Sequence, residues 1–499
     1  MEERNDEKAL LSPLRLRGLR VAVEDSSSKK KGFGFVVAVA FTVNYIMGTG
    51  FLTLPYATAQ TGSVLTIVAL FSMAALSNIA KDYVLESSAR AELIENPSCF
   101  LTEGQAGGIV TPALVRRIHV SQDLPLLLTV KKRKYEMPTL CQLFLGYHGK
   151  VLYMICLSIY IYGALLAYGT VFANSVAAMF PLPAPHADAS YGVYLGLFAV
   201  LVIPLSCLEL TEQISVQMAL ASCRLLMVAS MVGSVLAACA HTGESFPGQQ
   251  EPVGIPLWRW EGMPVFLPIA CYSFIYHHSI AGLSHPVRDK TLLGQIFLAT
   301  FVMSGIFYGV IALLVAYYFG PGMAQSSNLE WKGYGHTGLG RVVGTYVLLF
   351  PALDVASAFP LNAITLGNNM LDMGNDQKRP DGSPDHPSRV TTVAFRLLAA
   401  IPPLVAALFL RDLGRISEYA GTVGIIITLV FPAVLNLRSR TRMKDLFQLE
   451  SARTYYSNEL SRKRYGPVNL AIGIGLFLYI LINLLMDWKK SCVDCSTKG

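Results

Sequence analysis

Long apolar segments recur along almost the whole chain, and they restrict its fold more than any other feature. A helix needs about 20 mostly apolar residues to cross a bilayer, because the hydrocarbon core is about 30 Å thick. Only 15% of the residues are charged, against about 25% in soluble proteins. The sequence therefore predicts an all-α, multi-pass membrane protein with about eleven transmembrane helices. The expected spans are 33–60, 62–86, 151–180, 191–210, 214–240, 262–283, 292–319, 340–371, 391–410, 415–437 and 468–488.

The distribution of Lys and Arg predicts the orientation. With the N-terminus in the cytosol, 32 of the 40 basic residues fall in cytosolic segments or adjoining span ends, and 8 fall on the far side. Basic residues are enriched in cytosolic loops, so we expect a cytosolic N-terminus and a non-cytosolic C-terminus. Arg224 lies well within the fifth span, and we expect that helix to project into the cytosol first. The net charge of +7 comes from these loops and does not indicate nucleic-acid binding.

The segments outside the spans divide the chain further. Residues 1–32 are polar and basic and are predicted to be a disordered cytosolic tail. Residues 33–488 form the expected transmembrane domain, which contains a cytosolic loop at 89–150. Within that loop, residues 135–148 are expected to form a short helix. Residues 489–499 are expected to be a short non-cytosolic tail.

The first span contains residues that are unfavourable inside a helix. Asn44 is polar, Gly48-Thr49-Gly50 follows, and Pro55 comes one turn later. Gly and Pro destabilise a helix interior by about 1 and 3 kcal/mol relative to Ala. Unwound backbone at membrane depth is tolerated where it is buried in protein or lines a cavity, and many transporters bind substrate and ion there. The alternative is a kinked helix that packs closely through its small residues.

The sixth span carries a second interruption. Pro264 and Pro268 lie in its outer half, and Ser273, His277 and His278 bring polar groups to its middle. Adjacent histidines are expected to face the bundle interior or a cavity, because exposure to lipid is costly.

The two interruptions lie five spans apart, and this odd number gives the two halves opposite orientations. That arrangement is typical of inverted-repeat transporters with a site at the repeat interface. We expect a first repeat at about 33–240, a second at about 262–437, and an extra helix at 468–488.

Two polar residues on other spans complete the candidate site. Tyr168 lies on the third span, where a tyrosine can close over a substrate or simply pack and make one hydrogen bond. Asp354 lies within the apolar eighth span, and a carboxylate at that depth is a functional-site hypothesis by default. It can bind a cation, carry a coupling proton, or hold a neighbouring hydroxyl.

Four short motifs, in order along the chain, resemble the amino acid/auxin permease family and its sodium-coupled neutral amino acid transporters. The motifs are Asn44-Tyr45-Ile46-Met47-Gly48-Thr49-Gly50, Gly163-Ala164-Leu165-Leu166-Ala167-Tyr168, Ser273-Phe274-Ile275-Tyr276-His277, and Gly421 to Ala433 with Phe431-Pro432-Ala433.

The resemblance implies a LeuT-like 5+5 inverted repeat plus one extra helix, alternating access, and amino-acid substrates. It also implies that Asn44 contributes to ion coupling. In the eighth span, alignment on Phe359-Pro360 puts Leu353 where the relatives carry a threonine that completes their sodium site. Sodium coupling is therefore in doubt, and proton coupling is an alternative.

We therefore expect a secondary active transporter of amino acids, with neutral ones favoured, that is coupled to Na⁺ or H⁺ and needs no other cofactor. The alternative is an amino-acid sensor that signals through its cytosolic segments with little flux. The chain shows no enzyme-like constellation and no metal-ligand motif. The predicted substrate contacts are Gly48, Thr49, Gly50, Tyr168, Ser273, Phe274 and His277, and the predicted ion contacts are Asn44 and Asp354.

The N-terminal tail contains a short sorting-like motif. Asp6, Leu10 and Leu11 fit the acidic dileucine pattern D-x-x-x-L-L, which resembles signals read by sorting adaptors. An endosomal, lysosomal or vacuolar membrane is therefore slightly favoured over the plasma membrane. The expected partners are the amino acid, the lipid bilayer and these adaptors.

Overall fold

The computed structural model describes residues 32–96, 128–130, 133–184, 186–208, 214–240, 246–249, 251–374, 388–448, 453–462 and 464–497. These ranges are mostly helical, and their β pairing is limited to three isolated bridges. Since backbone polar groups must pair within a helix when lipid surrounds them, long apolar segments fold in this way. The prediction of an all-α, multi-pass membrane protein is confirmed.

Ten spans are identified in this part of the chain by length and composition. Nine helices are each long and apolar enough to cross a membrane. One bent pair, α3 (Phe35–Ile46) and α4 (Gly50–Thr61), is long enough only when its two helices are taken together. The nine are α5 (Ser63–Glu95), α7 (Met137–Met179), α8 (Ser190–Cys207), α9 (Ile214–Cys239), α12 (Leu293–Phe319), α13 (Gly338–Gly374), α14 (Arg389–Ala407), the continuous α15 (Leu413–Ile425), η7 (Ile426–Val430) and α16 (Phe431–Phe447), and α17 (Gly466–Thr497).

The segment expected as the sixth span accounts for the difference between ten and eleven. It is divided into α10 (Met263–Phe274), the single turn η4 (His277–Ser279), and the short helix α11 (Ile280–Ser284). Neither α10 nor α11 is long enough to cross a bilayer alone. The chain is therefore interrupted in both places where the sequence predicted an interruption.

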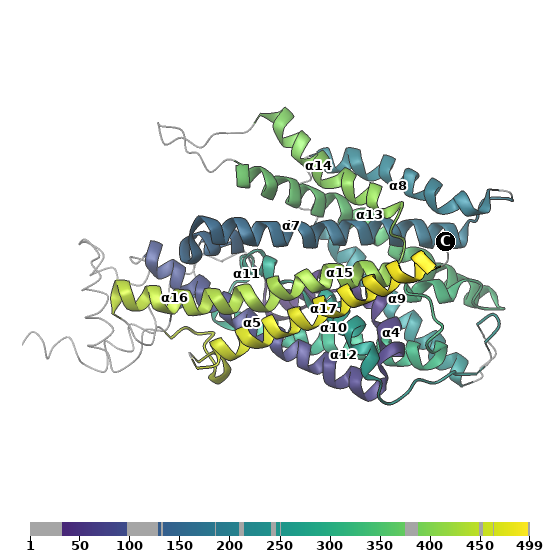
Figure 1. Cartoon of the computed structure of the whole chain (residues 1–499), viewed down its shortest axis with the longest axis horizontal. Helices are drawn as coiled ribbons and strands as arrows, with labels where there is room; N and C mark the ends of the chain where they lie inside the picture. The colour runs from purple at the N-terminus through teal and green to yellow at the C-terminus, as the bar shows by residue number, and fades with distance from the viewer. Residues whose placement is uncertain are drawn as a thin grey trace, which may run out of the picture.

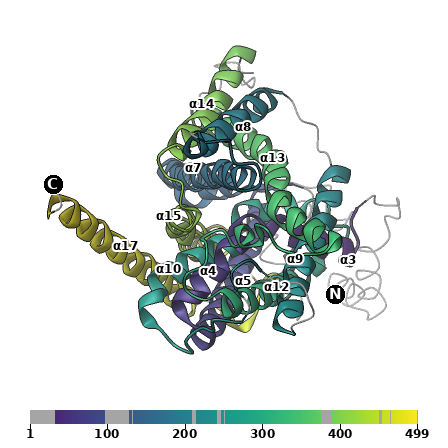
Figure 2. The same ribbon diagram turned by 90° about the vertical axis from the view of Figure 1, so that its right-hand side faces the viewer.

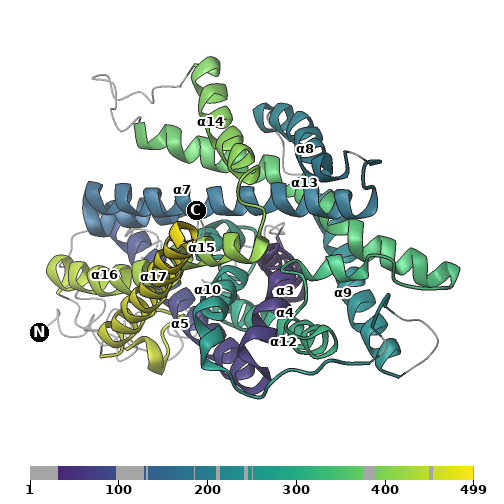
Figure 3. The same ribbon diagram turned by 45° about the vertical axis from the view of Figure 1, so that its right-hand side comes forward.

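The helices form two groups. The first group contains α3, α4, α5, α10 and α12, which pack on one another, and the second contains α7, α8, α13 and α14. Figures 1 and 2 show these groups as the lower and upper parts of the molecule. Helices α9 and α15 contact members of both groups. The broken helices both belong to the first group, and Figure 3 shows α3 and α4 beside α10 and α12.

The segment before the third span forms the short helix that we expected. This helix begins at Met137, and the backbone turns at Gly146, which has φ 76°, before α7 continues. Glycine adopts this left-handed conformation without the steric cost that a side chain would add. The short helix therefore meets the span at a kink.

Candidate functional site

The first interruption separates α3 from α4 and bends them by 64°. The N–H of Met47 still donates to Val43 O (3.0 Å), but the N–H of Gly48 donates to Ile46 O (2.8 Å). In a continuous helix the Gly48 N–H would instead bond to the carbonyl of Asn44. The break therefore frees the Asn44 carbonyl for a partner from outside the helix.

The second interruption follows Phe274. Ile275 is extended (φ −77°, ψ 117°), and the chain re-enters a helical turn at His277. The N–H of Ser279 donates to Tyr276 O (2.8 Å), which closes that turn. As at the first break, backbone carbonyls at the end of the helix lose their intrahelical partners.

The two interruptions face each other at close range. A Cβ atom added to Gly50 would lie 2.5 Å from Ser273 Oγ, so only glycine fits at this contact. Thr49 Oγ1 and Tyr272 OH are 3.0 Å apart and share a hydrogen bond. Segments more than 200 residues apart in sequence therefore meet at their unwound points.

Tyr308 on α12 contacts the carbonyls of both breaks. Its hydroxyl lies 3.2 Å from Ile46 O and 3.0 Å from Ser273 O, and its side chain is fully buried. A phenol has one proton to donate, so the two carbonyls share it. Tyr308 is therefore the side chain that connects the two broken helices from a third helix. Sequence reasoning did not single it out, because it lies in an unremarkable apolar span.

Space is available beside Gly48. A Cβ atom added there would have no heavy atom of another residue within 4 Å, in contrast to Gly50. The next helix, α4, starts two residues later, and its N-cap Thr49 makes no side-chain capping hydrogen bond. The first N–H groups of a helix and its dipole attract anions. The arrangement can therefore accept a carboxylate next to Gly48.

Asn44 and Asp354 are brought together by Arg224, a residue of α9. Arg224 Nη1 donates to Asn44 O (2.7 Å) and to Asn44 Oδ1 (2.9 Å). Arg224 Nη2 donates to Asp354 Oδ1 (2.7 Å) and Oδ2 (2.8 Å), and its Nε donates to Oδ2 (3.1 Å). Arg224 is only 7% exposed. We expected it to mark a cytosolic extension of its helix, whereas the structure points it inward at the first break. The sequence did contain a signal for this inward orientation. Arg224 lies inside an apolar span, and charged residues within the membrane usually face the bundle interior and have a functional partner.

Leu353 and Asp354 point in different directions. Leu353 is 65% exposed, on the outside of the helix bundle, whereas the Asp354 side chain is 14% exposed. A leucine on an outward face is compatible with lipid contact. Leu353, which aligns with the sodium-site threonine of the relatives, therefore points away from the contact between Arg224 and Asp354.

Three further residues were predicted to contact the substrate, and each has different neighbours in the structure. Phe274 is buried against Tyr308, with ring centroids 5.2 Å apart. His277 is buried, and its Nε2 lies 2.9 Å from Ser77 O on α5. Tyr168 is partly buried, and Asn362 Nδ2 of α13 donates to its hydroxyl at 3.5 Å. The assignment of these residues to substrate stays a prediction.

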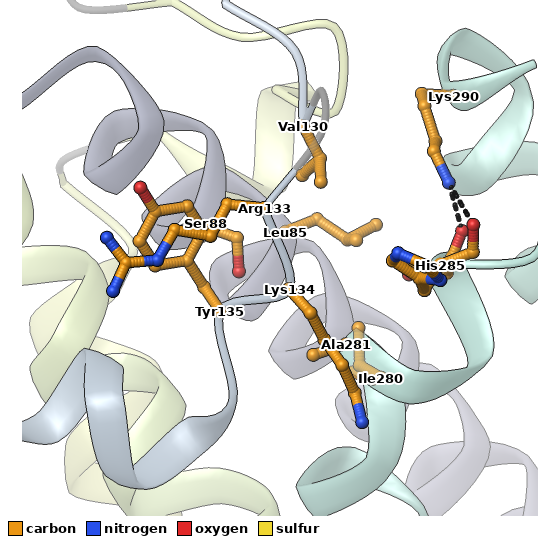
Figure 4. Close-up of a pocket in the computed structure, with 11 residues that line it drawn as sticks. Leu85, Ser88, Val130, Arg133, Lys134, Tyr135, Ile280, Ala281, His285 and Lys290 are labelled. Atoms are coloured by element: carbon orange, nitrogen blue, oxygen red, sulfur yellow. Dashed lines mark hydrogen bonds between the residues drawn. The ribbon is translucent and has the colours of Figure 1, made fainter. Parts of the chain in front are cut away.

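A small pocket with basic residues lies elsewhere, between α5, the segment before α7, and α11 (Figure 4). Its cations have partners: Lys134 pairs with Glu136 (2.7 Å), and Lys290 donates to Ser284 O (2.6 Å) and His285 O (2.7 Å). Burial, followed by the charges of nearby glutamates, raises the pKa of Tyr135, so this phenol is neutral at physiological pH. None of the predicted site residues lines this pocket.

Two further expectations concern metals and sorting. In the ranges that the structure describes, no group of three or more His, Cys, Asp and Glu side chains could hold a metal ion. Asp6, Leu10 and Leu11 lie outside the described residues. The sorting motif therefore stays a prediction from sequence.

Known proteins resemble this chain over most of its length. Transmembrane protein 104 of Homo sapiens is 25% identical over 91% of this chain and 97% of its own. The homologue from Drosophila melanogaster is 23% identical over 82% of this chain and 89% of its own length. The homologue from Dictyostelium discoideum is 23% identical over 93% of this chain and 99% of its own length. These names specify a membrane protein and no substrate.

A family model also matches the chain. The model described as "Transmembrane amino acid transporter protein" matches residues 118–455, which is more than half of the sequence. The match includes the second broken helix, the Tyr308 bridge, Arg224 and Asp354, and it begins after the first broken helix. The resemblance expected from the motifs is thereby confirmed, and the chain belongs to the transmembrane amino acid transporter family.

Proposed function

We propose that this protein is a secondary active transporter that moves amino acids across a membrane by alternating access. The observation that supports the proposal most directly is that two unwound helix segments contact each other. The chain also belongs to a family of amino acid transporters. Unwound backbone supplies bare N–H and C=O groups, and an amino acid presents one anionic and one cationic group to such partners. We propose no catalytic role.

The carboxylate of the substrate binds next to Gly48, at the N-terminal end of α4. The open space beside Gly48 and the uncapped start of α4 support this position. Thr49 and Ser273 provide hydroxyl groups at the same contact. Neutral side chains are favoured by family likeness.

Movement occurs between the two helix groups. The packing of α3, α4, α5, α10 and α12 against one another, and of α7, α8, α13 and α14 against one another, supports two bodies that tilt relative to each other. We propose a LeuT-like arrangement of two five-helix inverted repeats, at about 33–240 and 262–437, plus α17, in which each repeat contributes helices to both groups. Tyr168 closes over the substrate. A gradient of Na⁺ or H⁺ drives the cycle.

The test is uptake of a panel of labelled amino acids into proteoliposomes that contain the purified full chain. We expect at least one neutral amino acid to accumulate, and Gly48→Leu to abolish that accumulation because its side chain fills the space beside the break. Gly34→Leu is the matched control, since Gly34 also has no neighbour within 4 Å but lies before α3. Retained transport by Gly48→Leu at normal reconstitution would reject this position. Binding without flux by the unmodified protein would favour a sensor.

We also propose an endosomal, lysosomal or vacuolar location with a cytosolic N-terminus. The support is the dileucine pattern at Asp6, Leu10 and Leu11 and the asymmetry of basic residues. Replacement of Leu10 and Leu11 by alanine should move a tagged protein to the cell surface, as seen by surface biotinylation. An unchanged location would dismiss the motif.

A further inference from the structure

Arg224 contacts both residues that were predicted as ion contacts, Asn44 and Asp354. Its guanidinium donates to the backbone and side-chain oxygens of Asn44 and to both carboxylate oxygens of Asp354, at distances of 2.7 to 3.1 Å. The two charged side chains are 9% and 14% exposed. All three guanidinium nitrogens are used, so the contact is specific in orientation as well as in charge.

This oxygen set is of the kind that binds a hard cation. A freed carbonyl, an amide oxygen and a carboxylate at the end of a broken helix are typical ligands of the coupling ion in transporters with unwound spans. Here the carboxylate already has a positive partner. A sodium ion at the same oxygens would place two positive charges beside one negative charge, in surroundings where burial strengthens their repulsion.

We propose that Arg224 is a tethered substitute for the coupling sodium ion, so that this protein transports its substrate without Na⁺. This inference rests on the proposed transport function and narrows its choice of driving ion. A tethered cation stays with the protein when the substrate leaves, so the Na⁺ gradient contributes nothing to the cycle.

Arg224 also connects the two helix groups. Its helix, α9, contacts both α12 of the first helix group and α13 of the second. The side chain links Asn44 on α3 to Asp354 on α13, and therefore links the two groups next to the first break. In a sodium-coupled transporter, arrival of the ion makes such a link; here the link is present before any ion arrives.

The experiment compares the purified full-length protein in sodium chloride and in choline chloride at equal ionic strength. For the unmodified protein we expect the thermal unfolding midpoint to be the same in both salts. We also expect uptake into proteoliposomes to change by less than about twofold when choline replaces Na⁺, because an ion that does not bind cannot shift the equilibrium. A midpoint raised by Na⁺, or uptake that collapses without it, overturns the proposal.

Variants test the oxygens directly. Arg224→Met removes the guanidinium and leaves Asp354 and Asn44 in place, so we expect Na⁺ to raise its unfolding midpoint by several degrees. Arg224→Lys keeps a cation and should show no sodium response. Arg396→Met is the matched control, because Arg396 is equally buried on α14 and contacts Cys207 O and Leu208 O instead. Absence of a sodium response in folded Arg224→Met overturns the proposal.

The transport function and the role of Arg224 can fail separately. If no amino acid is taken up in either salt, the proposed transport function fails, and the unfolding midpoints still decide whether Na⁺ binds. If uptake occurs but requires Na⁺, the proposed transport function is supported, and the proposal that Arg224 replaces the sodium ion is rejected. If Arg224→Met does not fold, the comparison of salts on the unmodified protein decides.

Discussion

Two buried arginines of this protein pair with carboxylates in different surroundings. Arg90 on α5 pairs with Glu86 one turn earlier on the same helix, and its Nη1 also donates to Asn436 Oδ1 (2.7 Å) and Ser439 Oγ (2.9 Å) of α16. Arg224 on α9 pairs with Asp354 on α13 and with Asn44 at the end of α3. The first arginine belongs to a multiply connected network, and the second makes one link between separate helices.

The Arg90 network has internal redundancy. Glu86 accepts a second guanidinium, that of Arg440 (2.7 Å), and also the hydroxyl of Ser461 (2.5 Å). A buried polar network with several hydrogen bonds between elements makes a region rigid. The network therefore fixes α5, α16 and the segment around Ser461 to one another.

The Arg224 link has little redundancy. Its acceptors come from one helix break and one carboxylate. A link between two helix groups through a single side chain can open when the groups move, whereas the Arg90 network would have to lose several contacts together. The comparison shows that a buried ion pair can either fix a fold or connect its moving parts, depending on how many elements supply the ligands.

The largest expected effect comes from breaking the Arg90 network. Arg90→Met should lower the free energy of unfolding by about 3–5 kcal/mol, because it removes one partner of a fully buried pair. Denaturant unfolding of the purified protein in detergent micelles measures this loss. The control is Arg462→Met, whose pair with Glu459 is solvent-exposed and should cost about 1 kcal/mol or less. Equal losses would contradict the distinction.

A smaller effect on stability is expected at the Arg224 link. Asp354→Asn keeps the size of the side chain but removes the negative partner of Arg224, which should cost about 1.5–3 kcal/mol. Uptake into proteoliposomes should fall more than this loss of stability explains, because the link between the helix groups is weakened. If proton-driven flux stays unchanged, the carboxylate is structural and the two arginines do not differ in function.

The smallest expected effect concerns the Tyr308 bridge. Tyr308→Phe removes the hydroxyl that contacts Ile46 O and Ser273 O, and should cost about 0.5–1.5 kcal/mol. Tyr318→Phe on the same helix removes a hydroxyl that donates to Gln249 O (3.2 Å), and should cost about as much. Uptake should fall only in Tyr308→Phe. A parallel loss in both variants would show that the contact with the breaks has no special role.

Much of the fold could be predicted from local sequence. Hydropathy located every long helix in the described residues, since crossing a bilayer requires about 20 apolar residues whatever the neighbours are. The breaks were predictable as well, because Gly48 and Gly50 disfavour a helix and polar residues gather at Ser273 and His277. Asn44 and Asp354 were both selected as ion contacts, and they share one partner in the structure.

That partner could not be predicted. Arg224 is separated from Asn44 by 180 residues and from Asp354 by 130, and sequence alone does not specify which faces of three helices meet. Its charge was visible, but its direction was not, because a helix that projects into the cytosol before it enters the bilayer would also place Arg224 at the membrane surface. Similarly, the contact between His277 and Ser77 depends on how α5 packs beside the second break.

Composition and hydropathy by themselves determined that this chain spans a membrane many times through helices, and the small and polar residues determined where two helices come apart. These are local properties, since helix propensity and transfer into lipid act on each segment separately. Only the tertiary structure decided that the two breaks meet, that Tyr308 contacts both, and that an arginine already occupies the oxygens predicted for an ion. Such contacts depend on packing between distant segments, and packing selects one set of helix faces from many that have the same local pattern.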